Sequence, residues 1–152
     1  MKRFKKILVG VDMADGERLV SNNLKEPSRE AVEKAIWLAK ASAAHVTFYY
    51  VLPSWAANQN ASPAVPLDEG YDKRTVEDHA KEVMVNLVDQ ARSQGVVAES
   101  RVGYGRSWIE IIRQVIRADH DLVIVGAKDP NGVKQFLTGS TEIKLLRKCP
   151  CA

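Results

Sequence analysis

Four short apolar runs, each followed by a segment with helical character, constrain the fold of this chain more than any other feature. The runs span residues 6–11, 45–52, 96–102 and 121–126 and contain many β-branched side chains; the third run alternates and carries Glu99 and Arg101, which predicts a strand exposed on one side or at an edge. Such runs predict strands, and their alternation with helices predicts a parallel sheet. The sequence therefore predicts one domain over residues 1–152, an open, doubly wound α/β fold with helices on both faces of the sheet.

The intervening segments carry the periodicity of amphipathic helices. Helices are predicted over residues 28–43 and 71–94, the first with Ser28 as its N-cap and the second ended by Gly95. A third predicted helix has one apolar face, made of Trp108, Ile111, Ile112, Val115 and Ile116. Residues 54–70 include two prolines and little apolar periodicity, and they are predicted to form a surface loop, with a flap near a ligand as the alternative.

Right-handed crossovers in a doubly wound fold place a ligand at the carboxyl ends of the strands, where the strand order reverses. Asp12 follows the first predicted strand and Gly126 ends the fourth. If these two strands are neighbours, Asp12 and Gly126 meet at that point. The run over residues 121–126 is almost continuously apolar, which is typical of a central strand covered on both faces.

The stretch 123–146 joins a predicted strand, a glycine-bounded loop and the start of a helix. Gly126 ends the strand, turn-forming residues follow, and Gly139, Ser140 and Thr141 precede the helical segment. Free backbone N–H groups and the dipole at a helix start attract anions, so a phosphate group is predicted to bind here. A plain connection between strand and helix, with no ligand, is the alternative.

This stretch resembles the nucleotide-binding signature of the universal stress protein family, which reads Gly, two residues, Gly, nine residues, Gly, then Ser or Thr. Gly126 fills the first position and Gly139 and Ser140 fill the last two, while Asp129 stands in place of the second glycine. The likeness covers essentially the whole chain, from KKILVGVD near the start to LTGSTEIKLLRKCPC at the end. Together with the alternation of strands and helices, it implies the spatial strand order 3-2-1-4.

Several residue roles are implied by this resemblance alone. In ATP-binding members, an Asp after the first strand lies near the nucleotide, and the backbone of a residue at the end of the second strand meets the adenine. These positions are Asp12 and Val51 here. The implied phosphate contacts are Gly126, Gly139, Ser140 and Thr141. The Asp129 carboxylate would either repel a triphosphate or help to hold Mg²⁺ against it.

The family also includes members that lack the glycine pattern and bind no nucleotide. A nucleotide-independent interaction module of the same fold therefore stays open as an alternative function. The family's usual last strand, an apolar run just after Cys149-Pro150-Cys151, is absent from the sequence. The resemblance thus suggests a truncated chain, such as the first half of a tandem protein, whose fourth strand has an exposed flank. It also implies a homodimer or pairing with a second universal stress protein domain.

Composition and charge argue against several other classes of protein. No apolar stretch approaches the length of a transmembrane helix, and the apolar run after the basic N-terminus is too short for a signal peptide. A cytoplasmic protein without membrane contact is therefore expected. The net charge of +3, with both signs interspersed, disfavours nucleic acid as a partner. The two cysteines are too few for a zinc site and lack the redox spacing.

The sequence contains no recognisable catalytic constellation. It has no Walker A motif and no legible Ser-His-Asp set, and its histidines, His45, His79 and His120, are scattered along the chain. We therefore expect a stress-response domain that binds an adenine nucleotide, ATP. It is expected to act through nucleotide-dependent partner or dimer interactions, without rapid turnover and not as an enzyme.

Overall fold

The computed structural model describes residues 4–11, 26–52, 54, 66–67, 70–71, 76–126 and 141–152. The elements in chain order are β1 (Lys6–Gly10), α1 (Glu26–Ser42), β2 (His45–Leu52), β3 (Pro66–Leu67), β4 (Gly70–Tyr71), α2 (Val76–Ser93), β5 (Ala98–Tyr104), α3 (Ser107–Ala118), β6 (Leu122–Val125) and α4 (Thr141–Lys148). Among these elements, none is a helix both long and apolar enough to cross a membrane.

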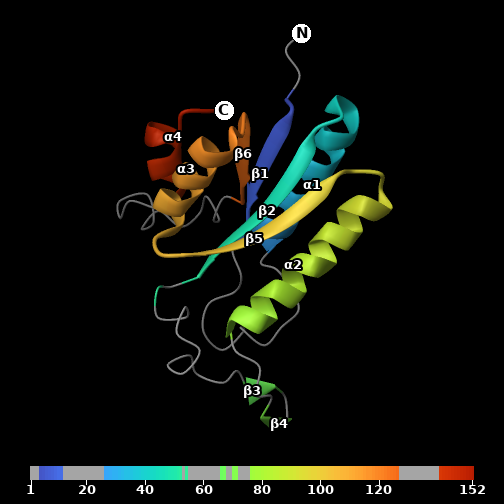
Figure 1. Ribbon diagram of the computed structural model, residues 1–152, viewed down its shortest axis with the longest axis vertical. Helices are drawn as coiled ribbons and strands as arrows, with labels where there is room; N and C mark the ends of the chain where they lie inside the picture. The colour runs from blue at the N-terminus through green and yellow to red at the C-terminus, as the bar shows by residue number, and fades with distance from the viewer. Residues whose placement is uncertain are drawn as a thin grey trace.

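The four longer described strands form a parallel sheet with the order β5-β2-β1-β6 (Figure 1). Counted along the four predicted strands, this is the order 3-2-1-4, so the predicted topology is confirmed. The short strands β3 and β4 pair separately and antiparallel, within the segment where the sequence analysis predicted a loop and the start of a helix.

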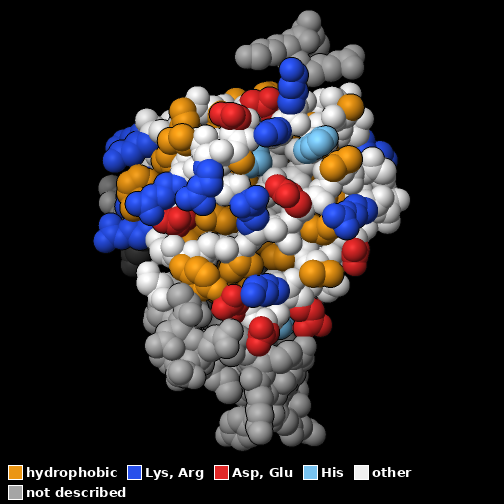
Figure 2. All heavy atoms as spheres, viewed as in Figure 1, with side chains coloured by type: hydrophobic (Ala, Val, Ile, Leu, Met, Phe, Trp, Pro, Cys, Tyr) orange, Lys and Arg blue, Asp and Glu red, His pale blue; other side chains and the backbone are white. Residues whose placement is uncertain are grey.

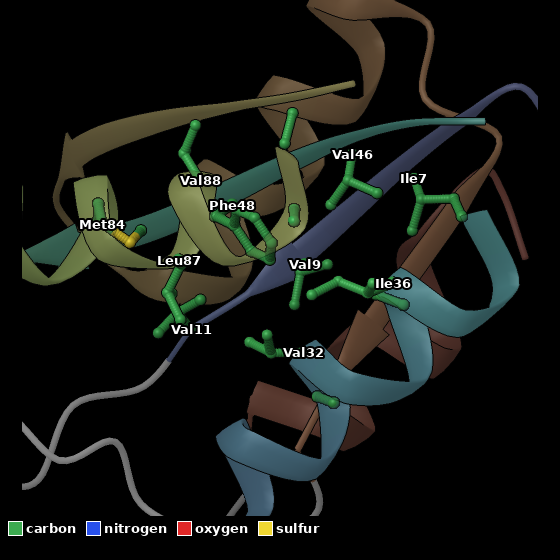
Figure 3. Close-up of a cluster of buried hydrophobic side chains, with 14 of the residues drawn as sticks. Ile7, Val9, Val11, Val32, Ile36, Val46, Phe48, Met84, Leu87 and Val88 are labelled. Carbon is green, nitrogen blue, oxygen red and sulfur yellow. The ribbon is translucent and has the colours of Figure 1, made fainter. Parts of the chain in front are cut away.

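Helices cover both faces of the sheet, as predicted for a doubly wound fold. Side chains of β1 alternate between the faces: Ile7 and Val9 belong to the cluster with α1 and α2, whereas Leu8 belongs to the cluster with α3 and α4. Figure 3 shows the first cluster, in which Ile36 of α1 and Leu87 of α2 point toward the strands. Since parallel strands need apolar cover on both faces, this arrangement explains why β1, β2 and β6 are so uniformly apolar, whereas β5, at the edge of the described sheet, carries Glu99 and Arg101.

Three predicted boundaries are corrected by the structure. The first helix begins at Glu26, so Ser28 lies within its first turn, 2% exposed, and is not the N-cap. Pro27 is accommodated in that turn because the first N–H groups of a helix have no intrahelical acceptor. The second helix begins at Val76, five residues later than predicted, because Tyr71 pairs in β4. The third long strand is β5, two residues later than the predicted 96–102.

The position of β6 agrees with the predicted order 3-2-1-4, although its apolar run is typical of a central strand. Within the described residues β6 lies at the edge of the sheet, paired with β1, and all four of its residues are half-buried. On its other side, the Val123 N–H donates to the carbonyl oxygen of Ala152 (2.7 Å). A continuous apolar run indicates that other elements pack on both faces of a strand. It does not indicate whether a neighbouring strand pairs with it on one side or on both.

The predicted apolar face of the third helix is confirmed except at one end. Ile111 and Val115 of α3 are buried against Leu8 and Leu145, whereas Ile116 is 64% exposed. The helix ends at Asp119, which adopts the left-handed conformation (φ 54°). This turn carries the chain directly into β6.

Candidate functional site

The parallel strands all end on the same side of the sheet, and this side is the candidate site. We call it the carboxyl edge, which is distinct from the two outermost strands, β5 and β6, of the described sheet. The chain runs from β1 outward to β2 and β5, then returns to pair β6 with the other side of β1. Gly10 pairs with Val125, so Gly126, which follows Val125, lies beside the end of β1. The reversal of strand order therefore falls between β1 and β6, where doubly wound sheets bind their ligands.

The end of β2 is open toward this reversal point. The register between β1 and β2 ends at the pair Gly10–Tyr49, and the Val11 N–H donates to the Tyr49 carbonyl (2.9 Å). The strand β2 nevertheless continues to Leu52, held on its other side by β5, where Val51 pairs with Gly103. Among the described residues, no strand pairs with Val51 on the β1 side. Its backbone polar groups on that side are therefore placed to meet a flat, hydrogen-bonding ligand.

Close packing beneath the edge fixes β1 and β6 relative to each other. A Cβ atom added at Gly10 would lie 2.8 Å from Val125 Cγ1 and 3.3 Å from Ile111 Cδ1. Contacts that short are not tolerated without a shift, so the glycine allows two strands and α3 to approach closely. The sequence analysis did not single out Gly10; its place in an otherwise apolar strand, ILVGV, was the available signal.

A polar cluster at the end of β5 borders the same edge, and the sequence analysis did not find it. The Tyr104 hydroxyl donates to the Glu77 carboxylate at the start of α2, and Lys81 Nζ lies 2.8 Å from that carboxylate. Burial, followed by the interaction with Glu77, raises the pKa of Tyr104 to about 12. Hydrogen bonds from Lys81 and Tyr104 lower the pKa of Glu77. Neither group is therefore poised to change its charge near neutral pH.

The glycines between β5 and α3 have structural roles. The Tyr49 ring lies against the backbone at Gly103, where a Cβ atom would collide with its hydroxyl. Gly105 has φ +129°, and its N–H donates to the Leu52 carbonyl (2.9 Å). A positive φ of this size favours glycine. Tight packing therefore explains Gly103, and the positive φ explains Gly105.

Helix α4 lies beside α3 on one face of the sheet (Figure 1). Leu145 packs into the cluster with Ile111, and the Nζ atoms of Lys144 and Lys148 lie 5.3 and 4.9 Å from the centre of the Trp108 ring. Cation–π contacts of this kind favour one placement of α4 on α3. The first residue of α4 is Thr141, one of the implied phosphate contacts.

The predicted site residues are only partly within the described structure. Val51 and Gly126 both lie at the carboxyl edge of the sheet, and Thr141 begins α4. The remaining candidates lie outside the described residues: Asp12, Asp129, Gly139 and Ser140. Within the described ranges there is no group of three or more His, Cys, Asp or Glu side chains that could hold a metal ion.

Comparison with known proteins identifies the fold and the family. Residues 3–152 match the model of the universal stress protein family. The chain belongs to this family. This universal stress protein is 24% identical to universal stress protein YxiE of Bacillus subtilis over 153 residues, which cover 97% of this chain and 96% of YxiE.

Two solved structures with similar folds contain adenine nucleotides. A universal stress protein in complex with cAMP superposes with a TM-score of 0.67 at 18% identity, covering 99% of this chain and 94% of the other. A universal stress protein family protein from Arabidopsis thaliana with AMP bound also gives 0.67, at 15% identity, covering 97% of this chain and 87% of the other. At these identities the likeness demonstrates a shared fold.

Proposed function

We propose that this universal stress protein binds an adenine nucleotide, ATP, at the carboxyl edge of its sheet and acts in a stress response. The observation that carries the proposal is the side of β2 at Val51 with which no described strand pairs, next to the carboxyl ends of β1 and β6. The two related folds with AMP and cAMP support the same ligand class.

In this proposal, each part of the nucleotide meets a different element. The backbone of Val51 hydrogen-bonds the adenine, and Asp12 contacts the sugar or the edge of the base. Gly126 and the start of α4 face the phosphates, which benefit from the free N–H groups and dipole of a helix N-terminus. The proposed phosphate contacts are Gly126, Gly139, Ser140 and Thr141.

Asp129 sets the strength of the proposed binding. A carboxylate about 4 Å from a phosphate charge costs about 4 kcal/mol at an effective dielectric near 20, and about 1 kcal/mol in bulk water. We expect this repulsion to weaken ATP binding unless Mg²⁺ lies between the two groups. Asp129 stands where the family's signature has its second glycine. This departure favours the second candidate function, an interaction module of the same fold that needs no nucleotide.

We further propose that the protein acts by changing its binding partners when a nucleotide binds, and that it does not act as an enzyme. The bound nucleotide would change the contacts of the domain with a second copy of itself or with another universal stress protein domain, in the cytoplasm. Slow ATP hydrolysis would not contradict this role, but rapid turnover would. Release of phosphate from ATP, followed over hours, measures the difference.

The decisive experiment compares nucleotide binding by the wild type and Gly139→Val. A β-branched side chain obstructs the approach of phosphate to the backbone and disfavours positive φ, so we expect Gly139→Val to abolish binding of ATP and AMP in calorimetry. Gly95→Asn is the matched control, because Gly95 lies at the turn after α2 with no neighbour within 4 Å of an added Cβ. Unchanged affinity in a folded Gly139→Val protein would show that the loop is not the site.

A further inference from the structure

A polar cavity lies at the opposite, amino-terminal edge of the sheet, away from the proposed nucleotide site. Its volume is about 390 Å³, within the range of small-molecule sites. It lies over the first residues of β1, β2 and β5, next to the C-terminal end of α3. The polar side chains that line it are Lys6, His45, Thr47, Arg92, Glu99 and His120.

One of the two histidines in this lining, His120, is buried, whereas His45 is exposed. His120 is 7% exposed, and neither of its ring nitrogens makes a hydrogen bond of good geometry among the described residues, although an interaction with the Lys6 backbone favours its protonated form and partly opposes the lowering of its pKa by burial. Its backbone is held firmly, because its N–H donates to the Val115 carbonyl (3.1 Å) and the next N–H, of Asp121, donates to the Lys6 carbonyl (3.0 Å). A buried polar group without a partner costs free energy, so an imidazole fixed in a cavity wall indicates a site that a ligand completes.

The charges around the cavity favour an anion. Lys6 and Arg92 each use part of their donor capacity on a backbone carbonyl, Lys6 Nζ on Ala118 (2.9 Å) and Arg92 Nη2 on Ala98 (3.1 Å). Their remaining N–H groups are available for a ligand, because an ammonium has three donors and a guanidinium has five.

Glu99 is the acidic side chain in the cavity lining, and it interacts with one polar and one basic neighbour. It accepts a hydrogen bond from the Thr47 hydroxyl (3.3 Å), and Arg101, outside the cavity, lies 3.9 Å from it. Figure 2 shows histidine among basic and acidic side chains on the upper part of the visible face. With Lys6 and Arg92 against Glu99, the lining retains an excess of positive charge.

We propose that this cavity binds a small phosphate-bearing metabolite, with a ring N–H of His120 donating to the phosphate and the side chains of Lys6 and Arg92 supplying further donors from the rim. Charge-assisted hydrogen bonds from such groups to phosphate oxygens are among the strong polar contacts in proteins. The site is independent of the proposed nucleotide site, because the two occupy opposite edges of the sheet.

Histidine proton resonances in NMR test the proposal on the full chain. Inorganic phosphate and glycerol 3-phosphate are the probes, each compared with NaCl at equal ionic strength. The His120 resonances, assigned by their loss in His120→Gln, should shift and saturate with either probe. Lys6→Gln and Arg92→Gln should each weaken the apparent affinity by roughly tenfold. Lys40→Gln removes an equal charge from an exposed position on α1 and should leave the affinity unchanged.

The buried His79 of α2, which does not line the cavity, serves as an internal reference. Equal shifts of His79 and His120, or equal effects of phosphate and NaCl, would overturn the proposal in favour of a cavity filled by water. Equal weakening of phosphate affinity by Lys6→Gln and Lys40→Gln would show that the affinity depends on the overall charge of the protein and not on the cavity, which would also overturn the proposal. Failure of ATP to bind at the other edge would leave these measurements unaffected, so the two proposals are separately testable.

Discussion

A methyl group added at Gly10 tests the close packing that holds the carboxyl ends of β1 and β6 together. In Gly10→Ala the new Cβ would lie 2.8 Å from Val125 Cγ1 and 3.3 Å from Ile111 Cδ1. The first distance forces a shift of Val125, which is itself fixed by pairing with Gly10 across the two strands. Overpacking of this kind costs about 1–3 kcal/mol.

A smaller gain opposes this cost. Replacing glycine by alanine in a strand recovers roughly 0.5–1 kcal/mol of conformational entropy. With mid-range values of about 2 kcal/mol for the cost and about 0.75 kcal/mol for the gain, the free energy of unfolding should fall by roughly 1 kcal/mol in urea denaturation, and the Tm should fall by a few degrees. The Val125→Ala variant removes the methyl group that collides, so Gly10→Ala in that background should be neutral or mildly stabilising.

A double-mutant cycle of Gly10→Ala and Val125→Ala tests whether the contact between these two residues causes the loss of stability. We expect Gly10 and Val125 to show a coupling energy of about 1–3 kcal/mol. Gly95→Ala is the control, because its cost comes from a φ of +79° with no neighbour within 4 Å, and Val125→Ala should not relieve it. A Gly10→Ala protein as stable as the wild type, or additive effects with Val125→Ala, would show that β1 and β6 do not approach as closely as described.

Two further predictions concern charge. Asp129→Gly should tighten ATP binding by at least about tenfold in calorimetry, more at low salt than at high salt; weaker binding of this variant only when Mg²⁺ is present would favour the metal role instead. Burial, then the charge of Lys6, lowers the pKa of His120 below its ordinary 6.5, so the unfolded chain takes up a proton at a higher pH than the folded protein. Stability should therefore fall as the pH drops through about 6.5, and His120→Gln should show a smaller loss of Tm between about pH 7.5 and 5.5; parallel losses in the two proteins would contradict this.

Local sequence pattern was sufficient for the class of fold. Alternating strand and helix segments led to a parallel, doubly wound sheet, and the order 3-2-1-4 followed once the family likeness was added. The spacing of Gly126, Gly139 and Ser140 pointed to the carboxyl edge, and the structure places Gly126 beside the end of β1 there. These features were predictable because side-chain periodicity and turn chemistry are encoded by residues close together in the chain.

Relations between residues far apart in the chain are visible only in the folded protein. The exposure of Ile116 and the tight contact at Gly10 depend on which elements are neighbours, and residue periodicity carries no such information. The pairing of Tyr104 with Glu77, and the cavity lined by His120, likewise bring together separate elements. Residue periodicity predicted most of the buried face of each helix and strand. Only the packed fold set the distances between charges and side chains, on which pKa values and binding sites depend.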